Sequence, residues 1–293
     1  YEIRLSLVGS EMCIRDRYRL AFDQATVEPT TDHAAMREQI ARVFPGNEEG
    51  FDRFLEKEQV RYDKMYPCLQ KDYTSLSRYF SKEMIRALPH LGLGKSVMDI
   101  LKGYFNEDEL RLAFTFQSKY LGMSAWECPG AFAMLPFVEH AHGIYHTQGG
   151  LSEISEAMAK VCREYGVEIR LNSPVKELVL EGRAVKGVEL ESGEMIHADE
   201  TVLNADFGYA MEHLVPKGVL KKYRPEKLRN MDFSCSTFML YLGLDKVYDL
   251  PHHTIFFAKN YRQNIEDVFQ YKKPVSYTHL RAHETKANLV CRL

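Results

Sequence analysis

Three histidines close together in mid-chain are the residues whose types most directly suggest metal chemistry. His140, His142 and His146 form an HxHxxxH cluster, and on a strand the first two would share one face, as metal ligands can. No further ligand completes the set at a known metal-binding spacing. We therefore expect structural or surface histidines here and no metal site.

A glycine pair, Gly149-Gly150, follows this cluster. Because glycine lacks a Cβ, the pair suits close backbone approach to a ligand as well as an ordinary loop before a helix. Another stretch, Gly92 to Ser96, is similar to the end of a phosphate-binding loop. Pro89 stands where the first glycine of such a loop should be and no strand precedes it, so we reject a phosphate site there.

The pattern after the glycine pair predicts the elements that would position it. Apolar residues at helical spacing predict a helix over 151–165. An apolar trio predicts a buried strand over 201–203, which ends in the polar loop Asn204-Ala205-Asp206. Alternation of apolar and polar residues predicts strands over 167–171, 175–180 and 185–190.

The rest of the chain reads mainly as helix. Strand patterns occur over 18–27, 236–244 and 254–258. Helical periodicity occurs over 32–43, 47–69, 76–105 in two pieces, 107–124, 207–214, 220–231 and 260–270. Residues 131–142 are apolar and rich in small side chains, with Pro136 as a kink or boundary.

The order of these elements, with their residues, resembles the flavin-containing amine oxidase superfamily, and within it most closely the phytoene desaturase (carotenoid desaturase) branch. Each motif is weak alone, and their order and spacing carry the resemblance. The matching segments are FTFQSKYL (114–121), 131–138, GIYHTQGG (143–150), VEIRLNSPV (167–175), TVLNAD (201–206) and FMLYLGL (238–244).

The resemblance implies FAD as cofactor and a hydrophobic, phytoene-like polyene as substrate, desaturated by hydride transfer to the flavin. It places Gly149 and Gly150 beside the flavin and the substrate tunnel, Val175 at the adenine end of FAD, and Asn204, Ala205 and Asp206 in the loop that closes the same domain. The residues just before the glycines, Tyr145 to Gln148, depart from the family pattern, which leaves the identity of the polyene open. The resemblance nominates no catalytic side chain.

The implied fold class is α/β with mixed α+β character: part of a two-dinucleotide-binding FAD domain, with a substrate domain of helices and antiparallel sheet. The expected divisions are 1–17 as a foreign or disordered end, 18–142 and 207–274 as the substrate domain, 143–206 as part of the FAD-binding domain, and 275–293 as a second such end. Both ends lack regular periodicity and look like translated sequencing-adapter DNA, so we expect an internal fragment, inactive by itself, with structurally detached ends.

Composition limits the partners and the location. The 293 residues are 45% hydrophobic and carry a net charge of −3, which suits a globular protein and excludes a basic nucleic-acid footprint. No apolar run approaches the roughly 18 residues of a membrane span. Six cysteines without a CxxC pair favour the cytoplasm.

Basic residues at four-residue spacing, Arg78, Lys82 and Arg86, alternate with apolar ones. They fit either a solvated helix face or an interfacial helix on the inner face of the membrane, from which a water-insoluble polyene would enter.

Two other functions stay open. One is a different amine-oxidase-like flavoenzyme, against which the apolar residues Phe132, Met134, Leu135 and Phe137 argue, because we expect them to line the tunnel. The other is a flavin-free isoprenoid carrier, which would need no glycine-rich nucleotide loop.

Overall fold

The computed structural model describes residues 13–15, 18–23, 25–231, 233, 240–246 and 253–269. The chain divides into two compact units. Unit 1 takes the described residues of Tyr1–Gly150 and Ser234–Leu293, and unit 2 takes those of Leu151–Phe233. The domain boundaries expected for the whole protein stay a prediction.

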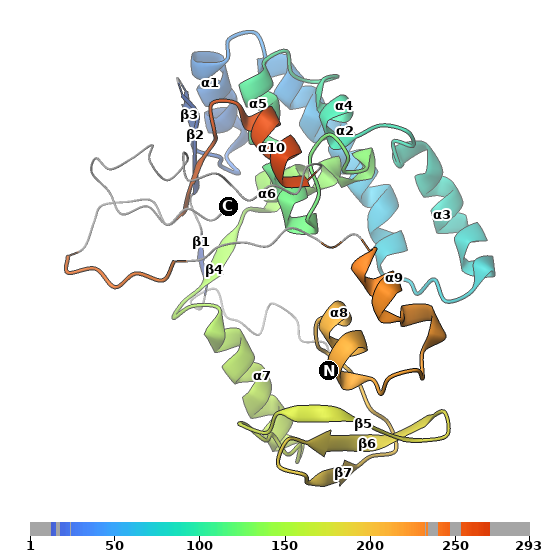
Figure 1. Cartoon of the computed structure of the whole chain (residues 1–293). Coiled ribbons are helices and arrows are strands. Elements are labelled where there is room, and N and C mark those ends of the chain that lie inside the picture. Colours follow the sequence, from blue (N-terminus) through green and yellow to red (C-terminus); the bar gives the residue numbers. More distant parts are fainter. Residues whose placement is uncertain are drawn as a thin grey trace. The chain divides into compact units, whose positions relative to one another are not determined.

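Unit 1 is mainly helical (Figure 1). Its helices begin where local signals place them: Asp32 caps α1 by accepting a hydrogen bond from the Ala35 N–H, and Ser96 with Asp99 forms a capping box on α4. The stretch similar to a phosphate loop is therefore the start of a short helix. The α-helices are α1 (His33–Val43), α2 (Glu48–Leu69), α3 (Lys82–Ala87), α4 (Val97–Leu101), α5 (Asp108–Ala113), α6 (Met134–His142) and α10 (Tyr261–Phe269). The 3₁₀ helices are η2 (Leu76–Phe80), η3 (Leu88–His90), η4 (Phe116–Leu121) and η5 (Gly130–Ala133).

Two small sheets complete unit 1. In one, β2 (Tyr18–Ala21) lies between β3 (Thr26–Val27), to which it is antiparallel, and β8 (His253–Phe256), to which it is parallel. In the other, β1 (Cys13–Arg15) pairs antiparallel with β4 (Tyr145–Thr147). The expected detachment of residues 1–17 is therefore not seen at β1, because the backbone edge of β4 accepts a neighbour whatever its sequence. Residues 275–293 lie outside the described residues.

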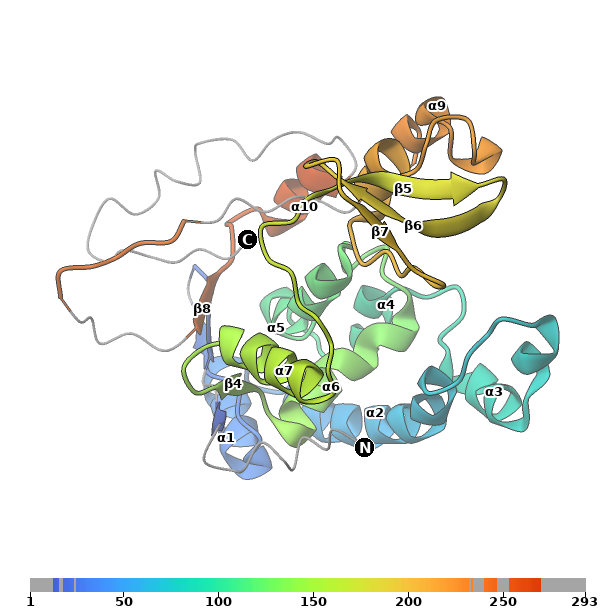
Figure 2. The ribbon, with the colours of Figure 1, turned by 90° about the horizontal axis from the view of Figure 1, so that it is seen from below.

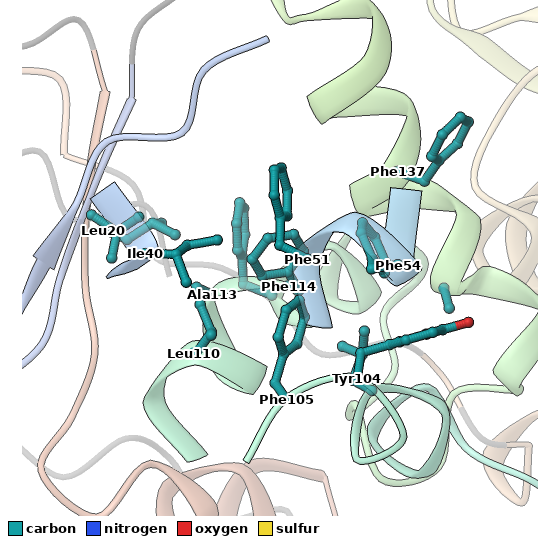
Figure 3. Packing of buried hydrophobic residues seen from close by; sticks show 14 of the residues in the cluster. Leu20, Ile40, Phe51, Phe54, Tyr104, Phe105, Leu110, Ala113, Phe114 and Phe137 are labelled. Atoms are coloured by element: carbon teal, nitrogen blue, oxygen red, sulfur yellow. The ribbon is translucent and has the colours of Figure 1, made fainter. Parts of the chain in front are cut away.

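The core of unit 1 is built from aromatic side chains on distant segments. Figure 3 shows Phe51 and Phe54 of α2 among Phe105, Leu110 and Phe114, with Ile40 and Leu20 on the side of the β2 sheet. Phe54 and Phe114 meet edge to face at 5.0 Å between ring centroids, a favoured geometry. Apolar faces of several short elements thus share one core.

One charged side chain is buried beside this core. Glu58 on α2 accepts a hydrogen bond from the Tyr104 hydroxyl at 2.9 Å and lies 3.0 Å from the Arg61 guanidinium. Burial raises the pKa of Glu58, against the opposing effect of Arg61. The hydrogen bond between Glu58 and Tyr104 joins α2 to the segment before α5.

Unit 2 consists of one long helix, an antiparallel meander and a group of short helical turns. The sheet order is β5-β6-β7, with β5 at an edge. Its elements are α7 (Ser152–Glu164), β5 (Val175–Glu181), β6 (Ala184–Leu190), β7 (Met195–His197), α8 (Phe207–Tyr209), the π-helical turn η6 (Ala210–Leu214), η7 (Lys221–Tyr223) and α9 (Pro225–Arg229).

Two strands expected in unit 2 are absent from the described residues. Residues 167–171 and 201–203 have no regular structure, and Val202 is 90% exposed rather than buried. A strand forms only with a hydrogen-bonded neighbour, and no described segment pairs with either stretch. The strand expected over 236–244 lies partly outside the described residues, and its last part, 240–244, is irregular. The mixed helix and sheet class is confirmed.

Candidate functional site

The glycine pair forms a turn at the end of unit 1. Gly149 and Gly150 have φ angles of 86° and 106°, which residues with a Cβ adopt only under strain. The Gly150 N–H donates to the carbonyl of Thr147 on β4 at 2.9 Å. The turn therefore needs glycine, and the contact of its backbone with a ligand stays a prediction.

Val175 begins β5. It lies opposite Leu190 on β6, and an irregularity in the pairing follows between Val175 and Glu177. Because β5 is the edge strand of its sheet, one side of its backbone faces no other described strand. Such an edge fits recognition of an adenine by backbone N–H and C=O groups.

The loop Asn204-Ala205-Asp206 is exposed in unit 2. The Asp206 carboxylate accepts a hydrogen bond from the Tyr209 N–H at 2.9 Å, so its first role is to cap a helical turn. Just before the loop, the Thr201 hydroxyl is buried without a hydrogen-bond partner in the described part of the chain. A buried hydroxyl without a partner is uncommon in folded proteins.

The predicted cofactor residues thus lie in both units. Gly149 and Gly150 belong to unit 1, whereas Val175, Asn204, Ala205 and Asp206 belong to unit 2. Each unit is therefore described by itself: bare backbone at the glycine turn in unit 1, and the edge strand β5 with the exposed 204–206 loop in unit 2. Which of them contact FAD stays a prediction.

A cluster that the sequence analysis missed surrounds Glu139 on α6. One oxygen of its carboxylate accepts hydrogen bonds from the Tyr18 hydroxyl at 3.1 Å and from the Gln117 amide at 2.6 Å. Burial raises the pKa of Glu139 to about 7, although both hydrogen bonds lower it. A carboxyl group with this pKa can gain or lose a proton near neutral pH. Its sequence signal was a single acid in the apolar stretch 131–142.

The three histidines lie on two elements: His140 and His142 on α6, and His146 on β4. His140 is fully buried, stacked on Phe114 at 4.5 Å between centroids, and burial lowers its pKa to about 4. Because α6 is a helix, His142 points to a different face. A backbone hydrogen bond with Thr30 raises the pKa of His140 against the larger effect of burial. The described residues contain no group of three metal-ligating side chains.

Two of the apolar residues expected to line a tunnel are buried in the cores of unit 1. Phe137 is buried in the aromatic core. Met134 belongs to a smaller cluster with Met65 and Ala87. The hydrophobicity of Phe137 and Met134 therefore serves folding, and the lining of a tunnel by the four residues stays a prediction.

The basic residues Arg78, Lys82 and Arg86 lie on η2 and α3, beside the C-terminal end of α2 (Figures 1 and 2). All three are exposed, and Arg78 forms an ion pair with Asp72 at 3.0 Å. Large apolar side chains are exposed on the same segment, including Leu76 at 81% and Phe80 at 77%. No described helix is long and apolar enough to cross a membrane.

Known proteins match most of the chain. The family model described as flavin containing amine oxidoreductase matches residues 13–262. The chain is 52% identical over 255 residues to a 4,4'-diapophytoene desaturase (4,4'-diapolycopene-forming) of Methylomonas sp, covering 87% of this chain and 50% of that protein. It is 34% identical over 261 residues to a zeta-carotene-forming phytoene desaturase of Myxococcus xanthus, covering 88% and 50%.

The chain therefore spans about half the length of the curated relatives it matches. The expected superfamily and its carotenoid desaturase branch are confirmed, and with them the flavin cofactor that defines the family. The chain belongs to the flavin-containing amine oxidoreductase family.

Proposed function

We propose that the whole protein is an FAD-dependent oxidoreductase that desaturates a phytoene-like carotenoid precursor. The observation that carries this proposal is the 52% identity, over 87% of this chain, to a diapophytoene desaturase. Other relatives are named as phytoene or carotene desaturases as well.

The flavin, when bound, supplies the acceptor for a hydride from a carbon next to the polyene. The described residues would contribute the surroundings. The Gly149-Gly150 turn would admit close backbone approach, and the edge strand β5 would hold the adenine end at Val175 through main-chain groups. The chain provides contacts and orientation, and no described group is assigned to the proton transfer.

The test is turnover by the completed gene product. Reconstituted with FAD and given phytoene or diapophytoene in lipid vesicles, it should convert the substrate to longer-wavelength polyenes, followed by absorption spectra and chromatography. Bound flavin with oxidation of an amine and no reaction with either polyene would favour the other flavoenzyme class. A completed protein that binds polyene and contains no flavin would indicate the isoprenoid carrier.

We also propose that the protein works in the cytoplasm and docks on the inner face of the membrane through η2 and α3. The support is the combination of three exposed basic residues, Arg78, Lys82 and Arg86, with exposed apolar side chains on one short segment. Basic groups attract anionic headgroups, and the apolar side chains enter the interface.

Changing Arg78, Lys82 and Arg86 together to Glu should weaken co-sedimentation of the completed protein with anionic vesicles by about 10-fold or more at low salt. The matched control changes Arg42, Arg53 and Lys57 to Glu, exposed residues on α1 and α2 with the same charge difference. Equal binding of both triple variants to the vesicles would show that Arg78, Lys82 and Arg86 form a solvated helix face.

A further inference from the structure

A buried amide oxygen on η4 has no hydrogen-bond partner in the described part of the chain. Gln117 is 1% exposed, and its Nε2 donates to one carboxylate oxygen of Glu139 on α6 at 2.6 Å. Its Oε1 is buried and accepts no hydrogen bond from a described residue. A buried acceptor in that state is costly unless a donor reaches it. The carboxyl group of Glu139, already in contact with this amide, becomes such a donor when it carries a proton.

Glu139 is surrounded by neutral groups, whereas the other buried acid of unit 1 has a cation. Glu58 on α2 lies 3.0 Å from the Arg61 guanidinium. Glu139 accepts instead from the Tyr18 hydroxyl at 3.1 Å and from the Gln117 amide. Burial raises its pKa and these two hydrogen bonds lower it, with no contribution from a described charged group. Without a cation beside it, a carboxyl group removed from water is more stable in its neutral form.

We propose that Glu139, Gln117 and Tyr18 form a proton-dependent latch within unit 1. The neutral carboxylic acid of Glu139 donates its proton to the Gln117 Oε1 and accepts from the Gln117 Nε2, so that acid and amide are joined by one hydrogen bond in each direction. The Tyr18 hydroxyl donates to the accepting oxygen. Loss of the proton removes one of these hydrogen bonds and places a negative charge beside the unpartnered Gln117 Oε1.

The latch joins three elements that are distant in the sequence, α6, η4 and β2. Since α6 leads through Gly143 into β4 and the Gly149-Gly150 turn, the latch also fixes the place where that turn begins. Glu139 is only half-buried, so its proton can exchange with water. The closed latch holds the proton more tightly than an open one, and it is therefore released as pH rises from about 4.5 through 7.

Other ionisable side chains lie on the elements packed around Glu139. They are His140 on α6, stacked on Phe114, His142 on α6, beside Tyr62 of α2, Lys119 on η4, over the Tyr261 ring, and His253 on β8, beside Tyr18. The variant Glu139→Gln keeps all of them. A pH dependence that disappears in this variant therefore belongs to Glu139.

Infrared spectroscopy of the completed protein tests the position of the proton. At about pH 6, where ordinary carboxyl groups are ionised, the difference between wild type and Glu139→Gln should contain the C=O stretching band of a protonated carboxylic acid. The band should disappear as pH rises through about 7. Gln117→Leu should move it to higher frequency, because the acid loses its amide partner. Absence of the band at about pH 6, or a band that Gln117→Leu leaves in place, would overturn the proposal.

Hydrogen exchange tests the release of the elements. The probes are the Gly143 N–H, which donates to the Glu139 carbonyl at 2.9 Å, and the Ser118 N–H, which donates to the Thr115 carbonyl at 3.0 Å. After correction for the intrinsic exchange rate, their protection should fall at least about 10-fold between about pH 4.5 and 7. The Tyr165 N–H in unit 2, which donates to the Val161 carbonyl at 3.1 Å, is the control and should not follow. An equal fall there would show unfolding of the whole chain and would overturn a local latch.

Two variants decide whether the pairing of acid and amide is the cause. In Glu139→Gln the carboxamide at position 139 can donate to the Gln117 Oε1 at every pH, so the protection of both probes should stay constant. The double variant Glu139→Gln with Gln117→Glu restores an acid–amide pair with the roles exchanged, and it should restore the pH dependence. The same pH dependence in wild type and Glu139→Gln, or none in the double variant, would contradict the latch.

Discussion

At the scale of single residues, Glu139 makes the stability of unit 1 depend on pH. Its pKa is about 7 in the folded chain and 4.5 in the reference state. The folded state therefore holds this proton more tightly, and the resulting stabilisation is lost as pH rises from about 4.5 through 7. Because the side chain is partly exposed, we expect the loss to stay below about 3 kcal/mol.

Glu139→Gln should flatten this part of the profile. The variant keeps an oxygen that can accept the Tyr18 hydrogen bond, and it has no titrating group. Denaturant unfolding at a series of pH values, for wild type and variant, measures the difference. A wild-type minus variant difference that does not change between pH 4.5 and 7 would show that Glu139 is not held protonated.

His140, the next residue on α6, should act with the opposite sign. Its pKa is lowered from 6.5 to about 4 by burial, so the unfolded state takes up a proton first and stability falls as pH drops from about 6.5 to 4. His140→Phe, in a site already lined by Phe51 and Phe114, should remove up to about 3 kcal/mol of that acid sensitivity. The same titration series measures it, and an unchanged acid limb in the variant would refute the assignment.

At the scale of elements, we expect the short pairing of β1 with β4 to contribute little to the free energy of unfolding. Only three residue pairs join the strands, and two-stranded pairings are marginal by themselves. Removing residues 1–17 together with 275–293 should therefore change the free energy of unfolding by less than about 1 kcal/mol. Thermal and denaturant unfolding of both versions measure the change. A loss of several kcal/mol would show that β1 is an integral strand and that the foreign-end interpretation is wrong for it.

At the scale of the whole molecule, we expect the 293-residue chain to bind FAD poorly and the completed protein to bind it well. The sequence between Tyr18 and Pro274 contains no G-x-G-x-x-G turn, the feature that holds the pyrophosphate at a helix N-terminus in dinucleotide-binding folds. Glycine backbone and a strand edge can contact FAD, but they cannot hold its charged pyrophosphate. Titration of FAD, followed by flavin fluorescence, compares the two proteins. A Kd near ~1 µM or tighter for the 293-residue chain would mean that the cofactor site is misplaced.

The sequence by itself determined the family and most of the local structure. The apolar spacing of α1, α2 and α7 and the alternation in β5 and β6 are confirmed, because helix and strand periods are local properties of the chain. The expected turn at 149–150 is present, with positive φ angles at both glycines. The motif order led to the correct superfamily before any contact was known.

Only the tertiary structure decided which of these apolar faces are buried and which polar groups meet. α2 buries Phe51, Phe54 and Met65, while α7, which also has an apolar stripe, buries none of its residues. The partners of Glu139 lie 22 and 121 residues away in sequence. The strands predicted at 167–171 and 201–203 are not formed in the described structure. Sheet pairing, burial and pKa depend on neighbours that are distant in sequence, and the local pattern does not show whether those neighbours are present. Periodicity identifies the face that an element offers, and only the folded chain determines whether another segment is present to cover it.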